Sequence, residues 1–266
     1  MRKTYFRIVA CLVVLVVEVF AACETAVAKD PTHAIGATFK IWNKDSTATC
    51  FLVSKDPTST DGHREYMLVT ANHALKKMSG NACRLIMRTT TKNSYKREEV
   101  GLPIRSAGQQ LWTKHPSADV AVLKVSLADR FAINAIPFEQ ILDDESSDTL
   151  NTADKVWVPG FPAQLEANKY GFPVLRSGTV ASFPISNEER TWLLAANTFA
   201  GDSGAPVVKV NREKPKLPLL VGIVIGIQRE TTKTTSHIEE RTVHRPLGLA
   251  IVVNAGIVRQ TIELLK

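Results

Sequence analysis

The sequence contains few cysteines, and it lacks the spacings that commonly hold metal ions. Four cysteines occur among its 266 residues, and none of them belongs to a C-x-x-C pair. The H-E-x-x-H pattern of a helical zinc site is also missing. We therefore expect no metal site.

The chain also lacks a basic stripe and a long uninterrupted apolar run. Its formal net charge is +7, but the basic residues are scattered and not interleaved with aromatic residues, so we do not expect nucleic-acid binding. The apolar run at residues 8–20 is interrupted by Glu18 and is too short for a membrane-spanning helix.

The first residues have the pattern of a secretory signal peptide. Basic MRKTYFR precedes the apolar run, and Ala26 and Ala28 occupy the small positions of an A-x-A cleavage site. We predict that residues 1–28 are removed and that the protein is exported, either periplasmic or secreted, without stable membrane association afterwards. The alternatives are an uncleaved anchor and a lipoprotein modified at Cys23, although Phe20 fits a lipoprotein motif poorly.

Two cysteines remain if the signal peptide is removed. Cys11 and Cys23 leave with it, whereas Cys50 and Cys83 stay in a chain that reaches an oxidising compartment. They lie on predicted strands on either side of TANHAL, so a disulfide between them is one prediction and burial as thiols is the other.

Short apolar runs rich in Val and Ile, separated by turn residues, make up most of the remaining chain and read as β-strands. Only the C-terminal NAGIVRQTIELLK has helical spacing. The acidic stretch 139–153 interrupts the strand pattern, and we read it as a crossover between β-domains at 34–138 and 154–266. A long surface loop in one domain is the alternative. The polar stretch 228–246 predicts an exposed hairpin or loop.

The stretch TFAGDSGAPVV, residues 198–208, surrounds a serine with small residues that permit a tight turn. A serine hydroxyl becomes a nucleophile when a base, itself held by a carboxylate, removes its proton. His73 follows an apolar strand in LVTANHAL, and Asp119 opens another in HPSADVAVLKV. Because strand ends present side chains to a cleft, we predict that His73, Asp119 and Ser203 form a catalytic triad.

These three segments resemble, in the same order, the T-A-A-H, H-P-x-x-D-(I/L)-A-(L/V)-L-K and G-D-S-G-G-P motifs of trypsin-like (chymotrypsin-fold) serine peptidases. VWVPGFP and LRSGTVAS are similar to the second barrel of bacterial exported members of the glutamyl-endopeptidase-like and high-temperature-requirement types. The resemblance spans about residues 34–262. It implies an all-β fold of two six-stranded Greek-key β-barrels, with the active site in the cleft between them and a C-terminal helix.

The resemblance also implies roles for the matching residues. Ser203 attacks the scissile carbonyl, His73 transfers protons, and Asp119 holds the imidazole tautomer. The backbone N–H groups of Gly201 and Ser203 form the oxyanion hole.

Substrate-binding positions follow from the same resemblance. Ile225, Gly226 and Ile227 would pair with an extended substrate, and Asn197 would lie at the base of the primary pocket. Val224 stands near the place where glutamyl-specific members have a histidine, so acidic specificity is not expected.

Some positions depart from the family pattern. Asn72 replaces a small residue before the histidine, and Ala205 replaces a glycine after the serine. The predicted mature start, KDPTHAIGA, lacks the apolar terminus that pairs with the aspartate before the serine, so Asp202 is not expected to need such a partner. No peptide-binding (PDZ) domain is expected after the peptidase part.

We predict a serine endopeptidase that acts on protein or peptide substrates through an acyl-enzyme and needs no cofactor. Two other functions stay open: a non-catalytic peptide-binding protein on the same fold, and an esterase-type acyl hydrolase using the same triad. The G-x-S-x-G elbow of α/β-hydrolases does not match, because GDSGA ends in Ala205.

Overall fold

The computed structural model describes residues 31–55, 59–143, 150–183, 185, 190–210, 217–235 and 240–265. The predicted signal peptide, with Cys11 and Cys23, lies outside the described residues. No helix in those ranges is long and apolar enough to cross a membrane.

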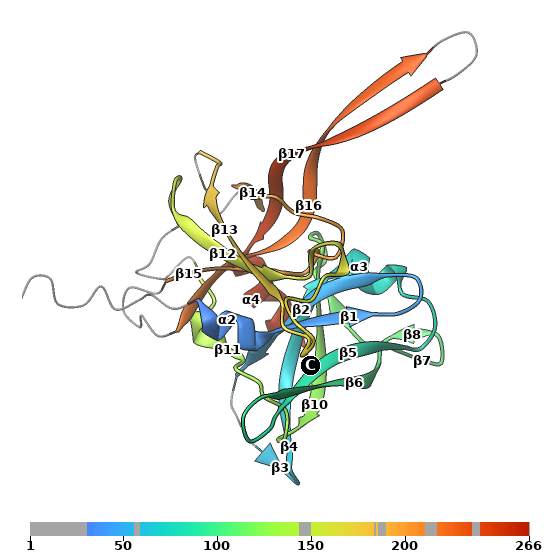
Figure 1. The fold of residues 1–266 in the computed structure, drawn as a ribbon, viewed down its shortest axis with the longest axis vertical. Coiled ribbons are helices and arrows are strands. Elements are labelled where there is room, and N and C mark those ends of the chain that lie inside the picture. Colours follow the sequence, from blue (N-terminus) through green and yellow to red (C-terminus); the bar gives the residue numbers. More distant parts are fainter. Residues whose placement is uncertain are drawn as a thin grey trace, which may run out of the picture. The chain divides into compact units, whose positions relative to one another are not determined.

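The first half of the described chain is a nine-stranded sheet with the order β6-β5-β1-β2-β4-β10-β9, to which β11 and β3 add beside β2 and β4 (Figure 1). Its longer strands are β1 (Thr38–Trp42), β2 (Thr47–Ser54), β4 (His63–Ala71), β5 (Ala82–Thr90), β6 (Tyr95–Pro103) and β10 (Val120–Ala128). The short ones are β3 (Ser59–Thr60), β9 (Thr113–Lys114) and β11 (Ile136–Pro137), while β7 (Arg105–Ser106) and β8 (Gln109–Gln110) pair separately. Helices α2 (Thr32–Ala37) and α3 (Asn72–Lys77) precede β1 and follow β4.

The second half closes into a six-stranded barrel with the order β12-β13-β14-β17-β16-β15. Its strands are β12 (Lys155–Gly160), β13 (Val174–Val180), β14 (Thr191–Ala195), β15 (Pro206–Val210), β16 (Pro218–Thr235) and β17 (Glu240–Asn254). Two 3-10 turns, η1 (Phe138–Gln140) and η2 (Pro162–Gln164), lie before and after β12, and α4 (Ala255–Glu263) ends the fold. The predicted fold class is therefore confirmed: a mostly β chain with a closed barrel, a sheet consistent with a second barrel, and a C-terminal helix.

Strand β2 shows why several strands read as continuous apolar runs. Cys50 and Leu52 point into the core of the first sheet, whereas Phe51 and Val53 point into a second apolar cluster. That cluster joins the first sheet to Ile223 of β16 and to α4. A strand buried on both faces loses the alternation of polar and apolar residues. The same cluster therefore holds the two halves of the fold together.

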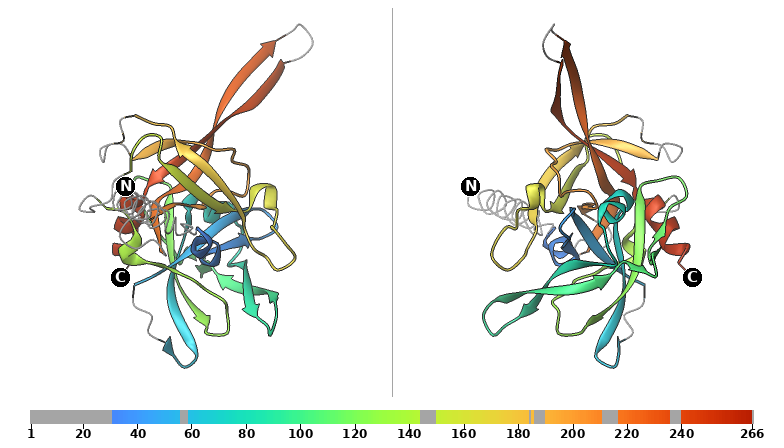
Figure 2. Two further views of the ribbon diagram at one scale, coloured as in Figure 1. Left: turned by 60° about the vertical axis from the view of Figure 1, so that its left-hand side comes forward. Right: turned by 90° about the vertical axis from the view of Figure 1, so that its right-hand side faces the viewer.

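The polar stretch 228–246 forms the outer part of the β16–β17 hairpin, as the sequence predicted. Strand pairing continues to Thr235 and Glu240, with residues 236–239 outside the described ranges. Figures 1 and 2 show this part of the hairpin extending away from the barrel. Several elements were not predicted, among them β6 and α3. Strand β6 was not predicted because its side chains are mostly polar and exposed. Helix α3 was not predicted because it has only six residues.

The predicted disulfide between Cys50 and Cys83 is wrong for this structure, in which both are buried free thiols. Strand β1 lies between β2 and β5, the strands that carry them. Two inter-strand spacings amount to roughly 9–10 Å, more than the roughly 7 Å between Cα atoms that a disulfide can span. Burial raises the pKa of Cys83 to about 12 and that of Cys50 well above its ordinary value, so both thiols stay protonated at neutral pH.

Candidate active site

Three ends of secondary structure meet at the predicted triad. Strand β4 ends at Ala71 and the chain turns directly into α3, whose second residue is His73. Asp119 immediately precedes β10, the neighbour of β4 in the sheet. Ser203 lies in the turn before β15, so the second half of the fold supplies it.

The structure brings these three side chains into one hydrogen-bonded series. His73 Nδ1 lies 2.5 Å from Asp119 Oδ2, and His73 Nε2 lies 3.1 Å from Ser203 Oγ. The other carboxylate oxygen, Asp119 Oδ1, accepts the backbone N–H of His73 at 2.8 Å. An imidazole that donates from Nδ1 keeps a lone pair on Nε2, and this lone pair can take the proton of the serine hydroxyl.

Asn72 has a structural role that explains its departure from the family pattern. Its side-chain oxygen accepts the indole N–H of Trp112 at 3.0 Å, and its backbone N–H donates to the carbonyl of Asp119 at 3.3 Å. These bonds fasten the start of α3 beside β10. They fix the backbone that carries His73.

The turn around Ser203 depends on two glycines with left-handed backbone, Gly201 at φ +100° and Gly204 at φ +90°. A Cβ on Gly201 would lie 2.3 Å from the carbonyl oxygen of Phe161. A Cβ on Gly204 would lie 2.1 Å from the carbonyl oxygen of Thr49. Thr49 of β2 binds the same turn through its N–H, which donates to the carbonyl of Ser203 at 3.0 Å.

We expect Gly204→Ala to lower the free energy of unfolding by about 3 kcal/mol or more, because the added methyl group meets backbone that cannot move aside. Gly80→Ala is the matched control, since Gly80 also has a positive φ of +76° but nothing lies within 4 Å of its Cβ position. The control is expected to lose only about 1–2 kcal/mol from the backbone. Urea unfolding measures both, and equal losses would contradict a close approach at Gly204.

Asp202, just before the serine, is paired within the barrel. Its carboxylate is almost fully buried, with 1% of the side chain exposed. Arg176 of β13 donates to its two oxygens at 2.8 and 2.5 Å, and the backbone N–H of Phe199 donates to it at 2.8 Å. As the sequence predicted, Asp202 does not need a chain terminus as its partner.

The backbone of the turn presents two free donors to the cleft. The carbonyl of Ala200 accepts the N–H of Ala163 at 2.7 Å. In a trans peptide the C=O and N–H groups point in opposite directions, so this bond aims the Gly201 N–H away from Ala163 and toward the cleft. Among the described residues, no acceptor is assigned to the N–H of Gly201 or of Ser203. Such a pair of donors can bind an oxyanion.

A cavity of about 820 Å³ lies over these groups. His73, Gly201 and Ser203 line one part of it, and residues 225–227 line another. Strand β16 pairs with β15 only as far as Ile223, and Val224 then bonds to the serine turn through Gly204 and Ala205. The edge of residues 225–227 thus borders the cavity at the side where a further strand can add.

The structure differs from the sequence prediction at Asn197. Its side chain is exposed and does not line the cavity, whereas the next residue, Thr198, lines the cavity and is 3% exposed. The hydroxyl of Thr198 is buried and has no hydrogen-bond partner among the described residues. The lining of the cavity thus includes Thr198 and leaves out Asn197.

No group of three or more His, Cys, Asp or Glu side chains in the described ranges could hold a metal ion.

The family model described as a trypsin-like peptidase domain matches residues 48–223. A crystal structure of Rv3671c from M. tuberculosis H37Rv, a serine-to-alanine mutant in its inactive form, matches 90% of this chain and 92% of its own chain. That match has 15% sequence identity and a TM-score of 0.47. No curated protein matches the chain.

Proposed function

Because the chain belongs to the trypsin-like peptidase family, we propose that it is a serine endopeptidase that uses Ser203, His73 and Asp119 to hydrolyse peptide bonds. The hydrogen-bonded series from Asp119 through His73 to Ser203, at the edge of a large cavity, is the observation that carries this proposal. The first half of the fold, 34–138, supplies the base and its carboxylate, and the second half, 154–266, supplies the nucleophile.

In the proposed reaction, Ser203 Oγ attacks the scissile carbonyl while its proton moves to His73 Nε2. The N–H groups of Gly201 and Ser203 stabilise the negative oxygen of the tetrahedral intermediate. His73 then protonates the leaving amine, and an acyl-enzyme remains on Ser203. Water, deprotonated by His73, attacks that ester and releases the second product. Asp119 keeps the imidazole in one tautomer and stabilises its charged form.

An extended substrate fits the open edge of β16. Residues 225–227 border the cavity beside the serine turn, and a peptide added to them as a strand would bring its carbonyl toward Ser203. This geometry favours protein or peptide substrates over small esters.

We also propose that the protein is exported, because residues 1–28 have the pattern of a signal peptide. Mass spectrometry of the protein from an expressing bacterium tests this. A mature chain that begins at Lys29 supports export, and retention of Met1 in the folded protein contradicts it.

A fluorophosphonate probe tests the catalytic proposal, because it forms a covalent bond to a serine only when a base and an oxyanion hole act on it. We expect one equivalent to label the protein without its first 28 residues, and Ser203→Ala to remain unlabelled. No labelling of folded protein would indicate a non-catalytic peptide-binding protein. Labelling with ester hydrolysis but without cleavage of any peptide would indicate an acyl hydrolase.

The buried hydroxyl of Thr198 predicts a preference for a polar side chain at the acyl residue of the scissile bond. Thr198→Val keeps the shape of the side chain and removes the hydroxyl. We expect kcat/KM for a peptide anilide ending in glutamine to fall about tenfold, and that for the matching methionine anilide to stay unchanged or rise. Equal changes in kcat/KM for the two anilides would show that Thr198 does not contribute to recognition of the substrate side chain.

A further inference from the structure

The loop between β12 and β13 connects the oxyanion hole to the first sheet. We call residues 161–171 the clamp loop. Near its start, the Ala163 N–H binds the Ala200 carbonyl, the bond that aims the Gly201 N–H into the cleft. The loop also approaches Gly201 closely, since a Cβ there would lie 2.3 Å from Phe161 O and 3.2 Å from Gln164 N.

The backbone of the clamp loop is unfavourable just where it meets the nucleophile turn. Ala163 has a φ of +49° and Gln164 a φ of +69°, a left-handed conformation that residues other than glycine rarely adopt. Such a conformation persists only when surrounding contacts enforce it. The position of the Ala163 N–H therefore depends on whatever holds the next residues of the loop.

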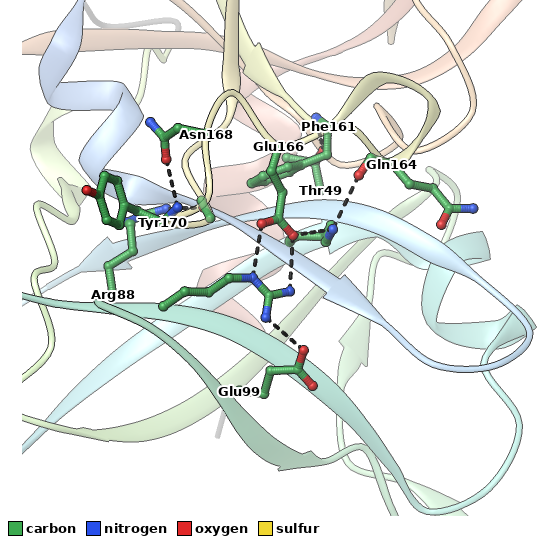
Figure 3. Close-up of polar contacts among 11 residues, drawn as sticks. Thr49, Arg88, Glu99, Phe161, Gln164, Glu166, Asn168 and Tyr170 are labelled. Carbon is green, nitrogen blue, oxygen red and sulfur yellow. Dashed lines mark hydrogen bonds and ion pairs between the residues drawn. The ribbon is translucent and has the colours of Figure 1, made fainter. Parts of the chain in front are cut away.

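Glu166 provides that hold through ion pairs with the first sheet (Figure 3). Its carboxylate accepts from Arg97 Nε at 3.0 Å and from Arg97 Nη2 at 3.1 Å, and it pairs with Lys40. Lys40 Nζ also donates to the carbonyl of Gln164 at 3.2 Å, so it grips the loop at two points. Arg97 is in turn bound to Glu99 at 2.9 Å.

These ion pairs are largely screened from water, since the exposed side-chain fractions of Lys40 and Glu166 are 12% and 16%. Burial raises the pKa of Glu166, but the hydrogen bonds from Arg97 and Lys40 outweigh it, and the pKa lies below its ordinary value. Glu166 is thus ionised at neutral pH, when the site would be active.

The other end of the clamp loop is held separately. Arg88 donates to the carbonyl of Gly171 at 2.9 Å. Its guanidinium carbon lies 4.3 Å from the centre of the Phe39 ring and 4.5 Å from that of the Phe172 ring. Loss of Glu166 therefore loosens the part of the loop near Ala163, where among the described residues only the bond from Lys40 to the Gln164 carbonyl then ties the loop to β1, and leaves its far end in place.

We propose that Glu166 is a positioning residue for the oxyanion hole: its pairs with Lys40 and Arg97 hold the Ala163 N–H on the Ala200 carbonyl and keep the Gly201 N–H in the cleft. Without this hold, the peptide between Ala200 and Gly201 can turn over and place a carbonyl where the oxyanion should bind. This inference rests on the proposed serine peptidase function.

The test compares Glu166→Gln with Glu98→Gln, both in the protein without residues 1–28. Glu98 is an acidic residue on β6 that pairs with Arg130 and Lys96 instead of the clamp loop. For a peptide that the wild type cleaves, we expect kcat to fall about 30-fold in Glu166→Gln with KM unchanged, since a lost oxyanion donor costs about 100-fold or more in kcat. Glu98→Gln should match the wild type.

Two ligands distinguish an effect on the oxyanion hole from an effect on the rest of the cleft. A peptide boronate forms a tetrahedral anion on the serine and needs the hole, and its affinity should fall with kcat in Glu166→Gln. The cleaved peptide, bound to the same variant on a Ser203→Ala background, should keep its affinity. An unchanged kcat, or an equal loss of affinity for both ligands, would overturn the proposal.

Arg97→Gln is a control for misfolding, because it leaves Glu166 paired with Lys40. We expect a smaller kcat loss in this variant, and the double variant Glu166→Gln/Arg97→Gln to lose little more than Glu166→Gln alone. Fully additive losses would overturn the shared role. If wild-type protein does not react with fluorophosphonate, the proposed function fails. If it reacts and Glu166→Gln behaves like the wild type, only this inference fails.

Discussion

Ser203→Ala is expected to lower kcat for peptide hydrolysis about a million-fold. In the proposed reaction the hydroxyl oxygen becomes acylated, and no other hydroxyl lies within reach of His73 Nε2 among the hydrogen bonds of the described residues. KM should change little, because the open edge at residues 225–227 remains.

His73→Ala is expected to have a similar effect, and the double variant Ser203→Ala/His73→Ala to be no worse than either single one, because the two groups act in the same step. Asp119→Asn should cost about 10⁴-fold, since an amide N–H facing Nδ1 favours the wrong imidazole tautomer. Steady-state kinetics on one quenched peptide measures all four. Appreciable hydrolysis by Ser203→Ala would mean that another group carries the reaction.

Arg176→Met is expected to lower the free energy of unfolding by about 3–5 kcal/mol and to inactivate the protein. The substitution leaves the Asp202 carboxylate buried with one backbone N–H as its charge-stabilising partner. Removing one member of a buried ion pair costs about this much, because the other charge stays in a poorly solvated place. The turn that bears Gly201 and Ser203 should rearrange to expose Asp202, and urea unfolding with fluorophosphonate labelling follows both effects.

Arg130→Met is the control for Arg176→Met, since it breaks an exposed pair with Glu98 and should cost about 1 kcal/mol or less. The double variant Arg176→Met/Asp202→Asn removes both charges and should recover much of the lost stability. If Arg176→Met were no more destabilising than Arg130→Met, the buried pair would not hold the turn.

Most of the fold and the three residues of the triad could be predicted from local patterns in the sequence. Strands β2, β4 and β10 each contain a stretch that is buried on both faces, so these stretches stand out as apolar runs, and His73 and Asp119 lie at the ends of two of them. Ser203 lies shortly before a further apolar run, β15. The groups that support them were not predictable in this way. Arg176 reaches Asp202 only because the barrel closes.

Glu166 and Thr198 show the same limit. Glu166 and Lys40 are 126 positions apart in the sequence, so no local spacing connects them. A lone glutamate in a polar loop also has no distinctive sequence pattern. Thr198 differs from exposed Asn197 by one position, and which of the two faces the pocket is set by the path of the backbone.

The separation between His73 and Ser203, 130 positions along the chain, has a consequence for the timing of activity. A polypeptide still being synthesised carries the proposed base and the proposed nucleophile on segments that have not yet met. The proposed hydrolytic activity therefore requires the apolar cluster between the sheet and the barrel to have formed. A chain whose two halves have not yet packed together therefore lacks the proposed activity.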